Sequence, residues 1–151
     1  MRRRSVLAGA LAAPVVLGLG FKGLGMAQGL PSLTLYDARL RPADRAASLI
    51  RLRGGDTRQT EGEIAALLLR ERLFAKGEAM LGITGHAEYL LAADIARMAG
   101  RKVVPLVQVG SNLRWFGSPA AEEWRPLLAD MFESRDGNAA STATAYAWVA
   151  A

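Results

Sequence analysis

Short apolar runs alternate with amphipathic segments from residue 33 to residue 107, and this rhythm limits the fold more than any other feature of the chain. Strands that alternate with helices form parallel sheets, because each crossover returns the chain to the same end of the sheet. We expect strands at 33–36, 49–52, 80–83 and 103–107, and helices at about 43–49, 60–76 and 88–98. The sequence therefore predicts an α/β domain with a mostly parallel sheet.

Capping and turn residues mark the ends of two of these helices. Thr60 and Glu63 have the spacing of a capping box at the start of the 60–76 helix, and Gly77 follows its end. Gly100 takes the same position after the next helix. The expected apolar face of that helix contains Leu91, Ile95 and Met98.

The last third of the chain predicts one more helix and one more strand. Ser118 is a typical N-cap for a helix that runs to about residue 133. Residues 142–149 alternate between small apolar side chains and polar or aromatic ones, which is typical of a strand, although a disordered tail is the alternative. No linker or repeat interrupts the chain, so residues 28–151 form one domain. In outline this domain resembles the Rossmann-like and flavodoxin-like folds, without a signature motif of either.

The first 27 residues have the pattern of an export signal peptide. Arg2, Arg3 and Arg4 precede an uncharged stretch over 5–21, and small residues lead to a cleavage site after Ala27. The uncharged stretch is rich in Ala and Gly and broken by a proline, so a permanent membrane anchor is the weaker alternative. We expect a mature chain without a stable anchor.

The leader also resembles the twin-arginine export signal, in which two arginines precede a variable residue and two hydrophobic ones. Arg3 and Arg4, followed by Ser5, Val6 and Leu7, fit that pattern. Arg2 and Ala8 depart from the residues usual at their positions, so the general secretion route stays open. The resemblance implies export in a folded state to the periplasm.

Composition removes several classes of function. The chain of 151 residues has no cysteine and a single histidine, which excludes disulfides, iron–sulfur clusters and a zinc site built from several histidines. Its net charge of +5 comes mainly from the leader, because the rest of the chain has 15 basic residues (the total of 19 less four in the leader) against 14 acidic ones. We therefore expect no nucleic-acid partner and predict no metal and no cofactor.

Polar residues follow three of the expected strands. Asp37 follows the first, Asp56 and Thr57 follow the second, and the third is followed by Thr84, Gly85 and His86. The carboxyl ends of parallel strands lie at one edge of a sheet, so these residues are expected to converge there. Thr84, Gly85 and His86 would hold an anion at a helix N-terminus, or Thr84 and Gly85 would simply cap that helix.

Two carboxylates in this set raise the possibility of catalysis. Asp37 and Asp56 would perform acid–base chemistry or bind a hard cation if they faced each other. An ion pair with Arg39 or Arg41, or exposure to solvent, is the alternative. The glycines before Asp56 lack both the dinucleotide-binding pattern and the Lys-Ser/Thr ending of a P-loop, so nucleotide binding is not predicted.

Aromatic residues are concentrated in the last third of the chain. These side chains form either part of the core or a surface for a partner, and they belong to Trp115, Trp124, Tyr146 and Trp148. The sequence favours an exported domain with an accessory role, which binds a periplasmic partner protein or a small polar ligand. The alternative is a small enzyme or anion-binding protein that acts at the carboxyl edge of the sheet.

The export route can be tested with a charge-conserving change in the leader. Replacement of Arg3 and Arg4 by lysine should abolish export, because a receptor reads the arginine pair and not its charge. Immunoblots of periplasmic and cytoplasmic fractions measure this, and N-terminal sequencing of the exported product should begin at Gln28. Undiminished export of the double-lysine chain would contradict the twin-arginine route.

Overall fold

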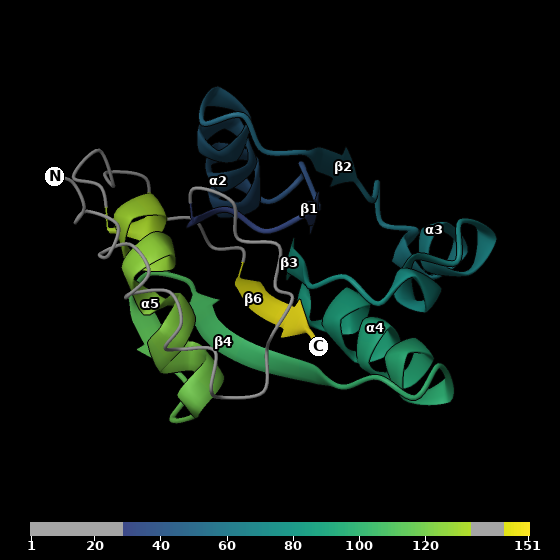
Figure 1. Cartoon of the computed structure of the whole chain (residues 1–151). Helices are drawn as coiled ribbons and strands as arrows, with labels where there is room; N and C mark the ends of the chain where they lie inside the picture. The colour runs from purple at the N-terminus through teal and green to yellow at the C-terminus, as the bar shows by residue number, and fades with distance from the viewer. Residues whose placement is uncertain (1–28, 134–143) are drawn as a thin grey trace, which may run out of the picture.

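The computed structural model describes residues 29–133 and 144–151, which form a six-stranded sheet with helices on both faces (Figure 1). Its strands lie in the order β2-β1-β3-β6-β4-β5. The strands are β1 (Leu33–Tyr36), β2 (Thr57–Gln59), β3 (Met80–Thr84), β4 (Val103–Val109), β5 (Leu113–Trp115) and β6 (Ala145–Ala150). The predicted α/β class is confirmed.

The sheet is mixed, although most of its strands run the same way. β1 is parallel to β2 and β3, and β4 has the same direction because β6 is antiparallel to both β3 and β4. β5, which the sequence did not predict, is antiparallel to β4 and lies at the edge. The four strands that share one direction, β1, β2, β3 and β4, are therefore divided by the antiparallel β6.

Helices cover the two faces of the sheet in separate layers. One face packs against α2 (Arg41–Leu52) and α5 (Pro119–Phe132). The other packs against α3 (Ile64–Arg70), the short 3₁₀ helix η2 (Leu73–Lys76) and α4 (His86–Met98). Alternate residues of the central strands enter the two cores, as the two-residue period of a strand requires. None of the described helices has the length and apolar character that a membrane crossing demands.

The chain from Arg41 to Leu52 is one helix, and the predicted strand at 49–52 was wrong. Ala43, Ala46, Ala47 and Ile50 are all fully buried, and their spacing places them on one helical stripe against the sheet. The apolar run at 49–52 continues this stripe. The second strand comes later, at Thr57–Gln59, so Asp56 precedes this strand and Thr57 begins it, whereas both were expected to follow a strand.

The 60–76 helix is shorter than the sequence indicated. α3 begins at Ile64, and the side chain of its N-cap residue Glu63 forms no capping hydrogen bond. The predicted capping box is therefore absent. Gly77 does end this segment, in the left-handed conformation at φ +71°. The backbone N–H of Ile64, at the amino end of α3, donates instead to the carboxyl group of Glu88 in α4, which lies 24 positions further along the chain.

The apolar face expected for α4 is only partly correct. Ile95 is buried, but Leu91 is 47% exposed and Met98 is 75% exposed. The buried stripe contains Glu88, Ala92, Ile95 and Ala96. Small side chains on that stripe let α4 lie close to the sheet.

The last strand is confirmed in its described part and has a central place in the sheet. β6 covers 145–150, whereas positions 142 and 143 of the predicted strand lie outside the described residues. Ser118 caps α5 as predicted, since its Oγ accepts a hydrogen bond from the backbone N–H of Ala121 at 3.1 Å. Trp124 and Trp148 are fully buried, which confirms the core interpretation for these two residues.

Trp148 packs across β3 at a position where only glycine fits. Gly82 is its cross-strand partner, and a Cβ on Gly82 would lie 2.0 Å from the indole ring. The indole N–H donates a hydrogen bond to Thr84 Oγ1 at 3.0 Å, so the polar atom of the buried ring is satisfied. This contact joins the last strand to the middle of the parallel set.

Gly82→Ala should therefore destabilise the domain. The added methyl group forces the indole or the strand to move, and we expect a loss of roughly 3 kcal/mol in the free energy of unfolding. Urea unfolding followed by tryptophan fluorescence measures it. Gly117→Ala is the matched control, because nothing lies within 4 Å of a Cβ there and it should differ little from the wild type. Equal stability of the two variants would contradict this packing.

Candidate functional site

The carboxyl ends of β1 and β3 form the topological switch point of the sheet. After β1 the chain passes through α2 on one face and enters β2, whereas after β3 it passes through α4 on the other face toward β4. Ligands of open α/β sheets bind where crossovers diverge in this way. Asp37, Thr84, Gly85 and His86 all lie here, and the Asp37 N–H donates to the Ile83 carbonyl at 3.1 Å.

Asp56 and Thr57 lie at the opposite, amino edge of the same strands. Thr57 is in register with Thr34 of β1, and the Asp56 carbonyl accepts a hydrogen bond from the Thr34 N–H at 3.0 Å. The expected convergence of Asp37 with Asp56 was therefore wrong. Its cause is the misplaced second strand, because a residue before a strand lies at the other edge from a residue after it.

Asp37 forms the ion pair with Arg39 that the sequence offered as an alternative. The carboxylate accepts from Arg39 Nε at 2.9 Å, from Nη2 at 2.7 Å and from the backbone N–H at 3.0 Å. Asp37 is buried, whereas the Arg39 side chain is 67% exposed. Hydrogen bonds from the guanidinium lower the pKa of Asp37 despite its burial, so this carboxyl stays ionised.

Glu88, in the first turn of α4, is a buried acid that sequence reasoning missed. One of its oxygens accepts from Thr60 Oγ1 at 3.0 Å and the other from the Ile64 N–H at 3.1 Å. Burial raises the pKa of Glu88, and the neighbouring charge of Asp37 raises it further. The available signal was its spacing, because Glu88 occupies the buried stripe of α4 together with Ala92 and Ile95.

Asp37 and Glu88 are a pair of carboxyl groups with opposite pKa shifts. Hydrogen bonds from Arg39 lower the pKa of Asp37, whereas burial and the nearby charge of Asp37 raise the pKa of Glu88. These directions mean that, when the pair holds a single proton, Glu88 retains it in preference to Asp37. Each of these carboxyl groups is occupied by hydrogen bonds from the protein.

Three rings lie beside this network. The His86 ring is 5.0 Å from that of Tyr146 on β6, and the ring of Tyr89 stacks on that of Tyr146 at 5.7 Å. His86 is exposed and forms no hydrogen bond within residues 29–133 and 144–151. Thr84, in contrast, is fully buried, and its hydroxyl donates to the Gly85 carbonyl and accepts from Trp148. Thr84 is thus part of the core.

The amino end of α4 is open among these groups. Gly85 is the N-cap residue and has no side chain to occupy the first N–H groups of the helix, and no other described side chain caps them. Leu40, next to Arg39, lies 3.9 Å from the position of a Cβ on Gly85. The helix dipole and the unoccupied N–H groups favour an anion at this point.

The described residues contain no group of three or more His, Asp or Glu side chains that could hold a metal ion. Comparison of the chain with protein-family models, with curated proteins and with solved structures finds no match. The site is therefore interpreted from its own geometry. This site contains the exposed guanidinium of Arg39, the exposed imidazole of His86 and the uncapped amino end of α4.

The Asp37–Glu88 pair should give the domain a distinctive dependence of stability on pH. The pKa of Glu88 is raised above its ordinary 4.5, so its contribution is present below 4.5 and is lost as the pH rises through the folded value. The pKa of Asp37 is lowered below 3.8, so its contribution is present above 3.8 and is lost as the pH falls through the folded value. Glu88→Gln resembles the protonated form of Glu88. It should therefore remove only the loss of stability at higher pH and leave the loss at lower pH, which comes from Asp37.

Urea unfolding of the wild type and of Glu88→Gln at a series of pH values measures this effect. Glu122→Gln is the control, because Glu122 is an exposed residue of α5 and its change should leave the profile as it is. A Glu88→Gln profile parallel to that of the wild type above the ordinary carboxyl pKa would contradict the assignment of the proton to Glu88.

Proposed function

We propose that this chain is an exported, non-catalytic α/β domain that binds a small polar ligand through an anionic group at the carboxyl ends of β1 and β3. The observation that carries the proposal is the open amino end of α4, which lies at the switch point of the sheet next to exposed His86. The ligand's anionic group would accept hydrogen bonds from the first N–H groups of α4.

Arg39 supports an anionic ligand over a cationic one. Its guanidinium uses Nε and Nη2 on Asp37 and leaves Nη1 without a partner among the described residues. Arg39 precedes Leu40, whose side chain lies 3.9 Å from the position of a Cβ on Gly85, and the Arg39 guanidinium packs against Gly62. Because the charges of Asp37 and Arg39 largely cancel in their ion pair, the field that favours an anion at this edge comes mainly from the helix dipole of α4.

The two carboxyl groups described at this site are engaged by hydrogen bonds and the imidazole has no orienting partner there, which favours binding over catalysis. Asp37 and Glu88 accept hydrogen bonds from Arg39, Thr60 and Ile64, so neither carboxyl is available to a substrate proton. His86 has no carboxylate or hydroxyl among the described residues to orient it. A base without an orienting group lacks the arrangement of a catalytic triad.

The exported location in this proposal rests on the leader. Arg3, Arg4 and Ala27 lie outside the described residues, so their role follows from the sequence pattern alone. A periplasmic, ligand-binding domain of this size would serve as an accessory to another exported protein. Its mature part would carry almost no net charge, which is consistent with a small ligand as the partner in place of nucleic acid.

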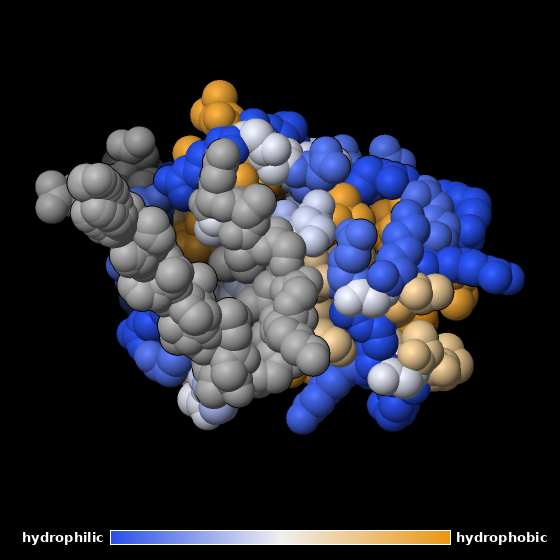
Figure 2. Space-filling view, viewed as in Figure 1, coloured by the Kyte–Doolittle hydropathy of each residue, from blue (hydrophilic) through white to orange (hydrophobic). Residues whose placement is uncertain are grey.

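A protein partner is the second candidate, and exposed leucines on one side of the molecule favour it. Leu69 of α3 is 57% exposed, and Leu90 and Leu91 of α4 are 48% and 47% exposed. Figure 2 shows apolar atoms among charged ones on the α3 and α4 side. The aromatic residues do not provide this surface, because Trp124 and Trp148 are buried and Trp115 lies under Arg125 at 4.8 Å.

Gly85→Asp should abolish anion binding without unfolding the protein. An aspartate at the N-cap would occupy the first N–H groups of α4 and repel an anion, and among the described residues the new Cβ would have only Leu40 within 4 Å, at 3.9 Å. We expect equal or slightly higher stability, by about 0.5 kcal/mol, and loss of binding. Titration with inorganic phosphate, followed by amide NMR shifts at His86 and Ala87, measures the binding.

Ser111→Asp is the matched control, because it adds the same charge to an exposed residue after β4. It should bind phosphate nearly as well as the wild type. If phosphate does not shift the amides of His86 and Ala87 in the wild type, or if Gly85→Asp binds equally well, the proposed ligand site is wrong. Turnover of a phosphate or carboxylate ester that depends on His86 would contradict the non-catalytic role.

A further inference from the structure

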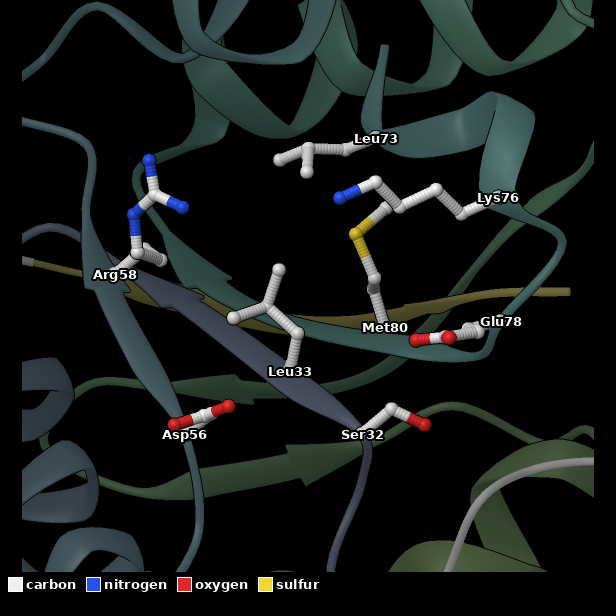
Figure 3. Close-up of a pocket in the computed structure, with 8 residues that line it drawn as sticks. All are labelled: Ser32, Leu33, Asp56, Arg58, Leu73, Lys76, Glu78 and Met80. Atoms are coloured by element: carbon white, nitrogen blue, oxygen red, sulfur yellow. The ribbon is translucent and has the colours of Figure 1, made fainter. Parts of the chain in front are cut away.

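A cavity of about 190 Å³ opens at the amino edge of the parallel strands, at the other end of the sheet from the site described above (Figure 3). It lies between β1, β2 and β3 on one side and η2 on the other. Its lining residues are Ser32, Leu33, Asp56, Arg58, Leu73, Lys76, Glu78 and Met80. This volume is below the roughly 300–1,000 Å³ of sites for drug-sized ligands, so the cavity suits a small molecule.

Two cationic side chains from separate elements reach into the cavity. Figure 3 shows Lys76 and Arg58 on opposite sides of the cavity, with the ammonium group of Lys76 reaching into the space above Met80. Lys76 has no hydrogen bond or ion pair with the described residues. Its ammonium group is therefore available to a ligand.

Arg58 is held in place by an acid outside the cavity. Its Nη2 donates to Glu71 Oε1, and this hydrogen bond lowers the pKa of Glu71, which keeps that carboxylate charged. The Nε and Nη1 donors of Arg58 have no partner among the described residues. The guanidinium is thus paired with Glu71 through one of its nitrogens and retains unused donors.

Part of the lining between the two cations is apolar, although the exposed lining as a whole is more polar than apolar. Leu33, Leu73 and Met80 supply hydrocarbon and thioether surface there, and Leu73 and Met80 are buried. Asp56, Ser32 and Glu78 lie along the other side of the cavity in Figure 3, away from the ends of Arg58 and Lys76. A ligand that contacts both the two cations and the apolar side chains would have one anionic group and an adjoining apolar portion.

We propose that this cavity binds a small organic monocarboxylate, with its carboxylate between Arg58 and Lys76 and its hydrocarbon chain against Leu33, Leu73 and Met80. A carboxylate accepts the hydrogen bonds of both cations, and burial of its chain adds a favourable hydrophobic term. Asp56 and Glu78 repel further negative charge, so phosphate and polyanions are disfavoured. The selectivity of this cavity thus differs from that of the open end of α4.

The test is a titration of the protein with sodium butanoate at constant ionic strength, followed by amide NMR shifts. The amides of Leu33, Arg58, Lys76 and Met80 should shift, whereas those of His86 and Ala87 at the other edge should not. Sodium acetate should bind more weakly than butanoate because its chain is shorter, and inorganic phosphate should leave the cavity amides unchanged. The amides of the cavity and those of His86 and Ala87 give separate signals. A failure of butanoate to bind in the cavity is therefore distinguishable from a failure of phosphate to bind at the amino end of α4.

Lys76→Met removes the ammonium group and retains a side chain of similar length. We expect butanoate affinity to fall by roughly tenfold or more, as for the loss of one charge-assisted hydrogen bond. Lys102→Met, on an exposed residue that does not line the cavity, is the matched control and should bind as the wild type does.

Three results would overturn the proposal. One is the absence of butanoate-dependent shifts at the cavity amides of the wild type. A second is equal affinity of Lys76→Met and Lys102→Met. The third is equal binding of acetate and butanoate, because the apolar surface of the cavity would then contribute nothing.

Discussion

The arrangement of this sheet depends on the contact between Trp148 and the bare backbone of Gly82. β6 has hydrogen-bonded neighbours on both sides, β3 and β4, so it joins the parallel strands β2-β1-β3 to the rest of the sheet. The indole covers the space where a Cβ would be, and its N–H bonds to Thr84. A large hydrophobic ring that has its one polar atom satisfied offsets the entropic cost of ordering the end of the chain.

Thr84 connects that core contact to the candidate ligand site. Its hydroxyl accepts from Trp148 and donates to Gly85, the residue from which α4 begins. On the other side of the same edge, Glu88 ties α4 to Thr60 and to the start of α3, and interacts with the Asp37–Arg39 pair. The elements that surround the open end of α4 are therefore held by buried hydrogen bonds, which favours a preformed site over one that assembles around its ligand.

The two edges of the parallel strands offer different chemistry. At the carboxyl edge, the charges of Asp37 and Arg39 largely cancel, and helix N–H groups remain for an anion. At the amino edge, two side-chain cations line a cavity together with three apolar side chains, with Asp56 and Glu78 on its other side. The separation follows from the sheet itself, since residues before and after a parallel strand lie a full strand length apart.

Local patterns in the sequence determined the α/β class, most helices, three of the four parallel strands and the described part of β6. They also determined the positions of Asp37, Gly85 and His86 at one edge, because each follows a strand that the pattern locates well.

The incorrect predictions of the second strand and of the site residues beside it have a common cause. Residues 49–52 look like a strand when read alone, but the stripe that begins at Ala43 makes them helical, and this error moved Asp56 and Thr57 to the wrong edge. Only the tertiary structure decided that Glu88 caps α3, that Trp148 faces Gly82, and that Arg58 and Lys76 share a cavity. Periodicity reports which face of an element is buried, whereas a contact between residues far apart in the chain depends on how whole elements pack.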